Sequence, residues 1–229
     1  MKLVFFHLSD LHFQDSKGAH PAKIHAVVDS LAAYMPFEGI VIVLSGDIAA
    51  TGNANQYKIA STFLGRLVST FRNKYLIREK NIKILIVPGN HDIDWGGQPR
   101  LDSATIRAFS DIEKEEYLQR ELKCMKNYFS FSDRNGCFFT YWMHIEFGQL
   151  ITRKILHFDN GYKIEANLIN TAPFSGSADD GLHYLPEDAI QSLTKASEAD
   201  LSLVLMPHSP DWFEFSQKKE LESIIAQRC

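Results

Sequence analysis

The fold of this chain follows from the stretch NIKILIVPGNHD, residues 81–92. Its aliphatic part, Ile82–Val87, is short and almost uninterrupted, which is typical of a strand buried on both faces. Pro88 and Gly89 then predict a sharp turn. The polar residues 90–92 come directly after the strand, and open α/β sheets bind their ligands at this end of their strands. We therefore expect residues 90–92 to belong to a functional site.

Three further apolar runs have the same design, at Leu3–Leu8, Ile40–Leu44 and Leu201–Met206. Between the first three strands, apolar residues repeat at helical spacing over Ala22–Met35 and Asn55–Tyr75. This alternation of strand and helix predicts a βαβ series and a largely parallel sheet. We expect the loops that follow all four runs to meet at one rim of that sheet.

The middle of the chain has a different pattern. A charged segment with helical periodicity comes first, and consecutive strands separated by turn residues follow it. Such strands pair antiparallel, so a second sheet is expected. The helix is predicted over Ser103–Phe129, the strands over Cys137–Ile145, Gln149–Phe158 and Tyr162–Asn170, and two later helices over 186–197 and 218–227. We expect one compact domain over residues 1–229.

Composition excludes several classes of protein. With 229 residues, 45% apolar and 23% charged, the chain has an ordinary globular composition. Its three cysteines show no CxxC spacing, which favours a reducing compartment over a zinc or disulfide framework. The net charge of −4 predicts no broad nucleic-acid surface. There is no apolar run near the ~20 residues of a membrane helix, and the apolar stretch at the start of the sequence is shorter than we expect of a signal peptide. We expect a cytoplasmic protein without membrane contact.

Metal-competent side chains follow each of the four apolar runs. They are Asp10 and His12, then Asp47, then Asn90, His91 and Asp92, and finally His208. A surface turn or polar loop explains the first, second and fourth motifs taken alone, whereas the polar stretch after the third run is harder to explain in this way. The joint occurrence of all four motifs at strand ends favours a site. Oxygen and imidazole donors without thiolate suit Mn²⁺, Fe or Zn²⁺. A carboxylate between two such clusters can bridge two cations, which together clamp a phosphoryl centre.

These motifs resemble, in order, the blocks of the calcineurin-like metallophosphoesterase superfamily. The blocks read Ser9-Asp10-Leu11-His12, Ser45-Gly46-Asp47, Pro88-Gly89-Asn90-His91-Asp92 and Met206-Pro207-His208-Ser209-Pro210. The second block continues as Ile48-Ala49 and lacks Asp-Arg-Gly, so the chain is most similar to the branch that includes class III cyclic-nucleotide phosphodiesterases. The resemblance implies an α/β fold, a four-layer αββα sandwich of two mixed sheets flanked by helices, with two divalent metal ions.

The resemblance also implies a role for each residue. Asp10 and His12 would hold the first metal, and Asn90 and His208 the second. Asp47 would bridge both. His91 would not bind metal but would donate a proton to the leaving oxygen or stabilise charge in the transition state. For Asp92 two roles stay open, because it either orients His91 or only closes the turn.

One block of the family is absent from this sequence. The family has a Gly-His-x-His block after the fourth strand, which supplies one histidine to each metal, and none occurs before Cys229. His157 and His183 lack its flanking pattern. Truncation explains the absence more simply than natural loss, so we expect the fold to be C-terminally incomplete and further sequence or domains to follow residue 229. Because each metal then lacks one histidine, inactivity of this chain by itself stays open as an alternative.

The expected function is metal-dependent hydrolysis of phosphomonoesters or phosphodiesters by a metal-bound hydroxide. Two alternatives stay open. One is a degenerate, non-catalytic interaction module with the same fold, which the absent block favours. The other is a nuclease of the superfamily, against which the acidic charge and the lack of a Lys/Arg cluster near the motifs weigh. Trp95, just after the third block, either stacks on a base or ring of a ligand or forms a wall of the core.

Overall fold

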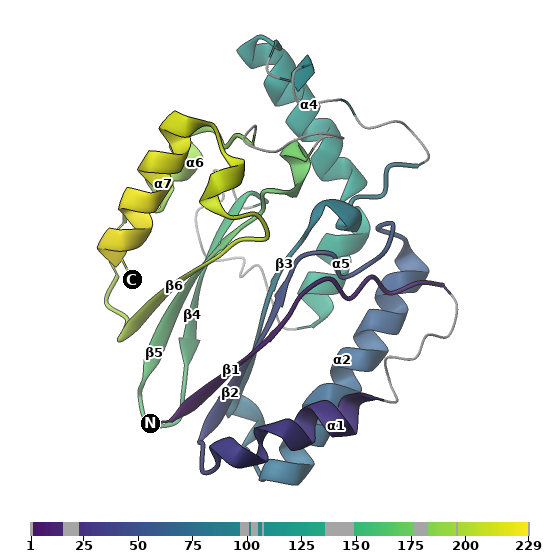
Figure 1. Cartoon of the computed structure of the whole chain (residues 1–229), viewed down its shortest axis with the longest axis vertical. Helices are drawn as coiled ribbons and strands as arrows, with labels where there is room; N and C mark the ends of the chain where they lie inside the picture. Colours follow the sequence, from purple (N-terminus) through teal and green to yellow (C-terminus); the bar gives the residue numbers. More distant parts are fainter. Residues whose placement is uncertain are drawn as a thin grey trace.

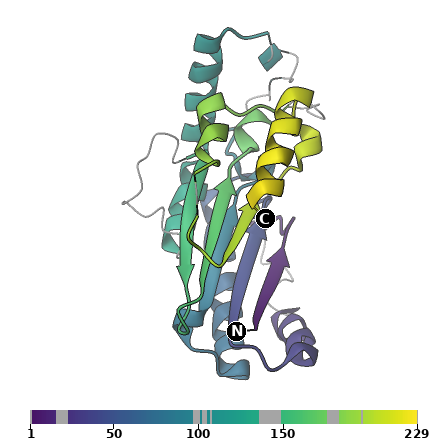
Figure 2. The ribbon, with the colours of Figure 1, turned by 90° about the vertical axis from the view of Figure 1, so that its left-hand side faces the viewer.

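Two three-stranded sheets pack face to face in the computed structural model of the chain (Figures 1 and 2). The structure describes residues 2–15, 23–96, 101, 105–106, 108–135, 149–175, 183–195 and 197–228. The first sheet has the order β1-β2-β3, with β1 at Leu3–Leu8, β2 at Gly39–Ser45 and β3 at Ile82–Val87. The second has the order β4-β5-β6, with β4 at Ile151–His157, β5 at Lys163–Ile169 and β6 at Leu201–Leu205.

Strand direction differs between the two sheets. All pairs of the first sheet are parallel, as the βαβ pattern predicts. In the second sheet β4 and β5 are antiparallel, whereas β5 and β6 are parallel. The core between the sheets is aliphatic, with Val41, Val43, Leu85 and Val87 from one side facing a matching set from the other. That matching set is Leu156, Ile164, Ala166 and Leu168.

Helices cover the outer face of each sheet, so the layers follow the order αββα (Figure 1). Over the first sheet lie α1 (Ile24–Asp29), α2 (Ala54–Tyr75) and α5 (Lys126–Arg134), and α4 (Asp111–Cys124) extends beyond the ends of the strands. Over the second lie α6 (Glu187–Ser192) and α7 (Phe215–Arg228). Short 3₁₀ turns are η2 (Ser30–Tyr34), η3 (Glu79–Asn81), η4 (Asn90–Asp92), η5 (Ala172–Phe174) and η6 (Pro210–Trp212).

Helix α2 shows why these segments fold as they do. The side chain of Asn53 accepts a hydrogen bond from the backbone N–H of Asn55 at 2.8 Å, which caps the first turn. Beyond it, one apolar stripe is buried against the first sheet. The stripe consists of Ala60, Phe63, Leu64, Leu67 and Phe71.

Three sequence-based expectations were wrong in detail. Strand β6 does not belong to the βαβ sheet, because it pairs with β5 after the crossover through α6. Strand β1 is not buried on both faces, because it lies at a sheet edge and leaves Phe5 42% exposed. The helix predicted over Ser103–Phe129 is divided at Met125 into α4 and α5. The strand expected over Cys137–Ile145 lies outside the described residues.

No helix in the described part of the chain combines the length and the apolar character needed to span a membrane.

Candidate metal centre

Backbone hydrogen bonds join the loops that follow β1, β2 and β3. The N–H groups of Asp10 and His12 donate to the carbonyl oxygens of Gly46 and Asp47, at 3.3 and 2.9 Å. The N–H of Gly46 in turn donates to the carbonyl of Val87 at 3.0 Å. Segments far apart in the sequence are thereby held as one unit at the carboxyl ends of the first sheet.

The backbone at these loops adopts a conformation that side chains disfavour. Asp10, His12 and Asp47 have φ angles of 55°, 44° and 50°, in the left-handed region. Among the described non-glycine residues, Leu76 is the only other one with a positive φ. Such strain costs of order 1 kcal/mol or more for each residue and clusters at functional sites. All three loop residues are among the ligands predicted from the sequence.

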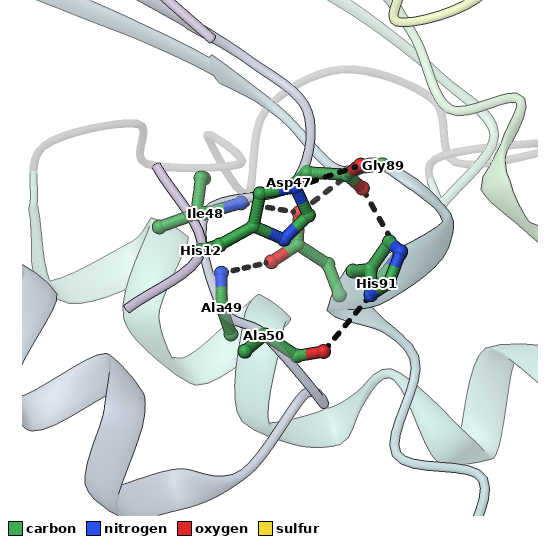
Figure 3. Close-up of polar contacts among 8 residues, drawn as sticks. His12, Asp47, Ile48, Ala49, Ala50, Gly89 and His91 are labelled. Atoms are coloured by element: carbon green, nitrogen blue, oxygen red, sulfur yellow. Dashed lines mark hydrogen bonds and ion pairs between the residues drawn. The ribbon is translucent and has the colours of Figure 1, made fainter. Parts of the chain in front are cut away.

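The side chains of His12, Asp47 and His91 converge (Figure 3). One ligand atom from each lies within 4.8 Å of the others. Nε2 of His12 is 3.8 Å from Oδ2 of Asp47, and the rings of His12 and His91 meet edge to face with centroids 4.7 Å apart. His12 and Asp47 stay partly open to solvent, with 37% and 16% of their side chains exposed. A ligand can therefore reach the cluster.

The loop after β3 holds the side chain of Asp47 in place. Its Oδ1 accepts a hydrogen bond from the backbone N–H of His91 at 3.0 Å, while Oδ2 faces His12. Gly89 packs so closely that a Cβ atom there would lie 2.1 Å from Oδ1 of Asp47. The two carboxylate oxygens thus have different neighbours, the His91 backbone for Oδ1 and the His12 ring for Oδ2.

A backbone carbonyl group determines which ring nitrogen of His91 carries a hydrogen. Nδ1 of its ring lies 2.9 Å from the carbonyl oxygen of Ala50 (Figure 3). A carbonyl only accepts, so Nδ1 carries a hydrogen, and the acid–base chemistry of the ring falls to Nε2.

Asp92 is fully buried beneath the cluster. Its carboxylate accepts hydrogen bonds from the backbone N–H groups of Ile48, Ala49 and Gly89, at 3.1, 2.8 and 2.8 Å. The hydroxyl of Tyr57 donates to it at 2.8 Å. Burial raises the pKa of Asp92 to about 6, and the four donors oppose this rise. These contacts join the β2 loop to the β3 loop and support the turn-closing role rather than the orientation of His91.

Family comparison agrees with this geometry. The sequence model of calcineurin-like phosphoesterases matches residues 3–223. The chain belongs to the calcineurin-like phosphoesterase family. A comparison with curated proteins found none that matches the chain. The two helix-flanked sheets are those expected of this phosphoesterase family, and membership indicates metal-dependent hydrolysis of phosphoesters.

The loop after β6 approaches the same rim of the phosphoesterase. A Cβ atom on Gly46 would lie 3.0 Å from Cβ of Pro207 and 3.3 Å from Cα of Gly89, so three loops meet there. His208 nevertheless lies outside the His12–Asp47–His91 group. Its Nδ1 is 2.6 Å from Oγ1 of Thr171 instead.

His208 also has a neighbour whose proximity sequence reasoning did not predict. The ring of fully buried His183 lies 4.3 Å from that of His208, centroid to centroid. Burial, aided by His183, lowers the pKa of His208 to about 3, so its imidazole is neutral at pH 7 and suited to bind a cation. Neither His183 nor Thr171 lies in a recognisable motif, so the sequence does not predict their contacts with His208.

Two further predicted ligands, Asp10 and Asn90, belong to the loops at the same rim. Asp10 lies beside Gly46 with an exposed side chain, and its carboxylate is not part of the His12–Asp47–His91 group. Asn90 begins the η4 turn and is half-buried. The imidazole and carboxylate donors at this rim are the types that Mn²⁺, Fe and Zn²⁺ accept, so the residues fit a divalent metal.

Proposed function

We propose that this phosphoesterase domain hydrolyses phosphomonoesters or phosphodiesters with two divalent cations. Asp10 and His12 would hold the first cation, Asn90 and His208 the second, and Asp47 both. The observation that carries the proposal is the convergence of His12, Asp47 and His91 at one rim of a sheet, where His12 and Asp47 have strained, left-handed backbones. When bound, the cations supply Lewis-acid stabilisation of the phosphoryl oxygens and lower the pKa of a water molecule.

Asp47 has the contacts that the bridging role needs. The backbone N–H of His91 fixes Oδ1, and His12 stands beside Oδ2. Because Gly89 packs against the carboxylate, the side chain has little room to rotate. Such preorganisation keeps the ligand in place without a further entropy cost when a cation binds.

His91 acts as the general acid in this proposal. Its Nδ1–H is held by the carbonyl of Ala50, which leaves Nε2 as the nitrogen that faces the ester. The proton on Nε2 then moves to the ester oxygen as the bond from that oxygen to phosphorus breaks. The role of Asp92 is indirect, since it positions the backbone around Asp47 through Ile48 and Gly89.

The second motif supports a phosphodiesterase. Gly46-Asp47 is followed by Ile48-Ala49, which is the feature shared with the cyclic-nucleotide phosphodiesterase-like branch. We therefore expect a diester such as bis-p-nitrophenyl phosphate to be turned over at least as well as p-nitrophenyl phosphate.

The test compares three variants of the full chain in Mn²⁺. Asp47→Asn should abolish turnover of bis-p-nitrophenyl phosphate. His91→Ala should slow it by about 10²–10⁴-fold while calorimetry still detects Mn²⁺ binding. Asp29→Asn is the matched control, because this exposed carboxylate pairs with Lys74 away from the rim. Full activity of the Asp47 variant would refute bridging, and a wild-type chain that binds Mn²⁺ yet hydrolyses neither ester would contradict the proposed activity of this domain.

A further inference from the structure

A pocket of about 450 Å³ opens beside His91. It lies between the segment that follows β2 and the segment that follows η4. Ala50 and Asn53 come from the first segment, and Ile93, Asp94 and Trp95 from the second. His91 lines the pocket and also belongs to the His12–Asp47–His91 group, so the ring joins the two sites.

The position of the pocket indicates which part of an ester it would bind. If His91 gives its proton to the leaving oxygen, the group attached to that oxygen lies beside the His91 ring. The pocket lies next to this ring and has a volume typical of small-molecule sites. It is much larger than a methyl or ethyl group requires.

The walls determine which leaving groups fit. Ile93 is fully buried and Trp95 half-buried, and both pack on the core of the first sheet, so this wall is rigid. An indole ring favours a planar ring stacked on it or meeting it edge to face. Asp94 adds a carboxylate held by the N–H of Gly96 at 3.2 Å and by the amide of Asn127 at 3.4 Å. A fixed carboxylate repels a leaving group that carries its own negative charge.

We propose that this pocket binds the leaving group of the ester and selects a neutral, planar aromatic or heteroaromatic one. The inference rests on the proposed function, since His91 must face the leaving oxygen. Trp95 and Asp94 are then specificity-determining residues, with Trp95 providing the stacking surface and Asp94 excluding anionic groups.

The test measures binding rather than turnover. Calorimetry on the Mn²⁺-loaded chain compares phenylphosphonate with methylphosphonate, which share the phosphoryl group and differ only in the ring. We expect phenylphosphonate to bind about three- to tenfold more tightly. Trp95→Leu, which keeps apolar bulk without a π-face, should remove this preference, and Trp95→Phe should retain most of it. Tyr34→Ala removes an exposed aromatic ring outside the pocket and should change neither affinity.

Charge selection needs a second pair of measurements. 4-Carboxyphenylphosphonate should bind more weakly than phenylphosphonate to the wild-type chain, and Asp94→Asn should reduce this difference in affinity severalfold.

A competition experiment against phenylphosphonate then distinguishes two kinds of ester that could supply the ring. Displacement by adenosine indicates nucleoside esters and displacement by phenol indicates aryl esters, and either supports the pocket.

Four outcomes would overturn the inference. Equal affinity for the phenyl and methyl compounds, or a preference that survives Trp95→Leu, would remove the stacking role while leaving the phosphoryl site intact. Displacement by neither adenosine nor phenol would exclude a leaving-group pocket. Failure of both phosphonates to bind the Mn²⁺-loaded wild type would instead remove the proposed function, and the inference with it.

Discussion

A Cβ atom on Gly89 would lie 2.1 Å from Oδ1 of Asp47 and 2.5 Å from its backbone nitrogen. No side chain fits this space without moving the backbone, so the β2 and β3 loops approach one another only because residue 89 is glycine. The same approach lets the N–H of His91 reach Oδ1 of Asp47. One contact therefore sets the relative position of the proposed bridging ligand and the proposed acid.

Replacing Gly89 with alanine should separate the two loops. We expect a loss of about 3 kcal/mol in unfolding free energy, because the overlap involves backbone atoms that cannot rotate away. Mn²⁺ affinity should fall with it. Urea denaturation and calorimetry measure both effects. Gly65→Ala in α2 is the control, since its Cβ would meet nothing within 4 Å and should be neutral or slightly stabilising. Equal stability of the two variants would contradict the close approach.

Asp92→Asn should destabilise the site without changing its shape. The carboxylate accepts from four donors, and an amide would turn its own NH₂ group toward some of them. We expect about 2–3 kcal/mol of lost stability in urea denaturation. Tyr57→Phe, which removes one donor and leaves the carboxylate, should cost about 1 kcal/mol. If the asparagine variant unfolded like the wild type, Asp92 would not be the anchor of these loops.

Thr171 should tune metal binding through His208. Its Oγ1 lies 2.6 Å from Nδ1 of His208, and such contacts orient an imidazole ligand. Thr171→Val keeps the shape and removes the hydroxyl, so Mn²⁺ affinity should drop about 10–100-fold while the chain stays folded. Thr171→Ser keeps the hydroxyl and should bind like the wild type. Unchanged affinity of the valine variant would argue that His208 is not a ligand.

The ion pair of Arg153 and Glu165 should make stability sensitive to acid. Glu165 is fully buried on β5, with Nε of Arg153 2.7 Å from its Oε2. Burial opposes ionisation, but hydrogen bonds from Ser197, Asn167 and Arg153 outweigh it and hold the pKa of Glu165 below its usual value.

Because the folded-state pKa lies below that of the unfolded chain, this stabilisation is present above about pH 4.3 and is lost as the pH falls through the folded-state pKa. Denaturation at several pH values should show Glu165→Gln losing less stability in acid than the wild type. Glu79→Gln, at an exposed ion pair, should keep the wild-type slope. Arg153→Met should cost about 3 kcal/mol at pH 7, because it leaves a buried carboxylate without its cation.

Local patterns predicted most of the elements of this fold. The bounds of β1 and β3 match the predicted runs, and α2 begins within one residue of its predicted start at Asn55. Helical spacing and aliphatic runs are properties of neighbouring residues, so they can be recognised without the fold. The predicted ligands likewise follow from their place at strand ends.

Long-range contacts decided the rest. The helix over Ser103–Phe129 breaks at buried Met125, and the carbonyl of Cys124 beside the break accepts a hydrogen bond from the N–H of Asp94. No local pattern near Met125 predicts this hydrogen bond with Asp94. The pairing of β6 with β5 was missed for a related reason, because an aliphatic run indicates a buried strand without naming its sheet.

The sequence by itself determined which side chains stand at the strand ends and which family the chain resembles, since both depend on residues close together in the chain. Only the tertiary structure decided that His91 approaches His12 and Asp47, that Asp92 turns away to hold the loops, and that His183 lies against His208. These relationships depend on hydrogen bonds and packing between residues that the chain keeps far apart, and no local periodicity records them.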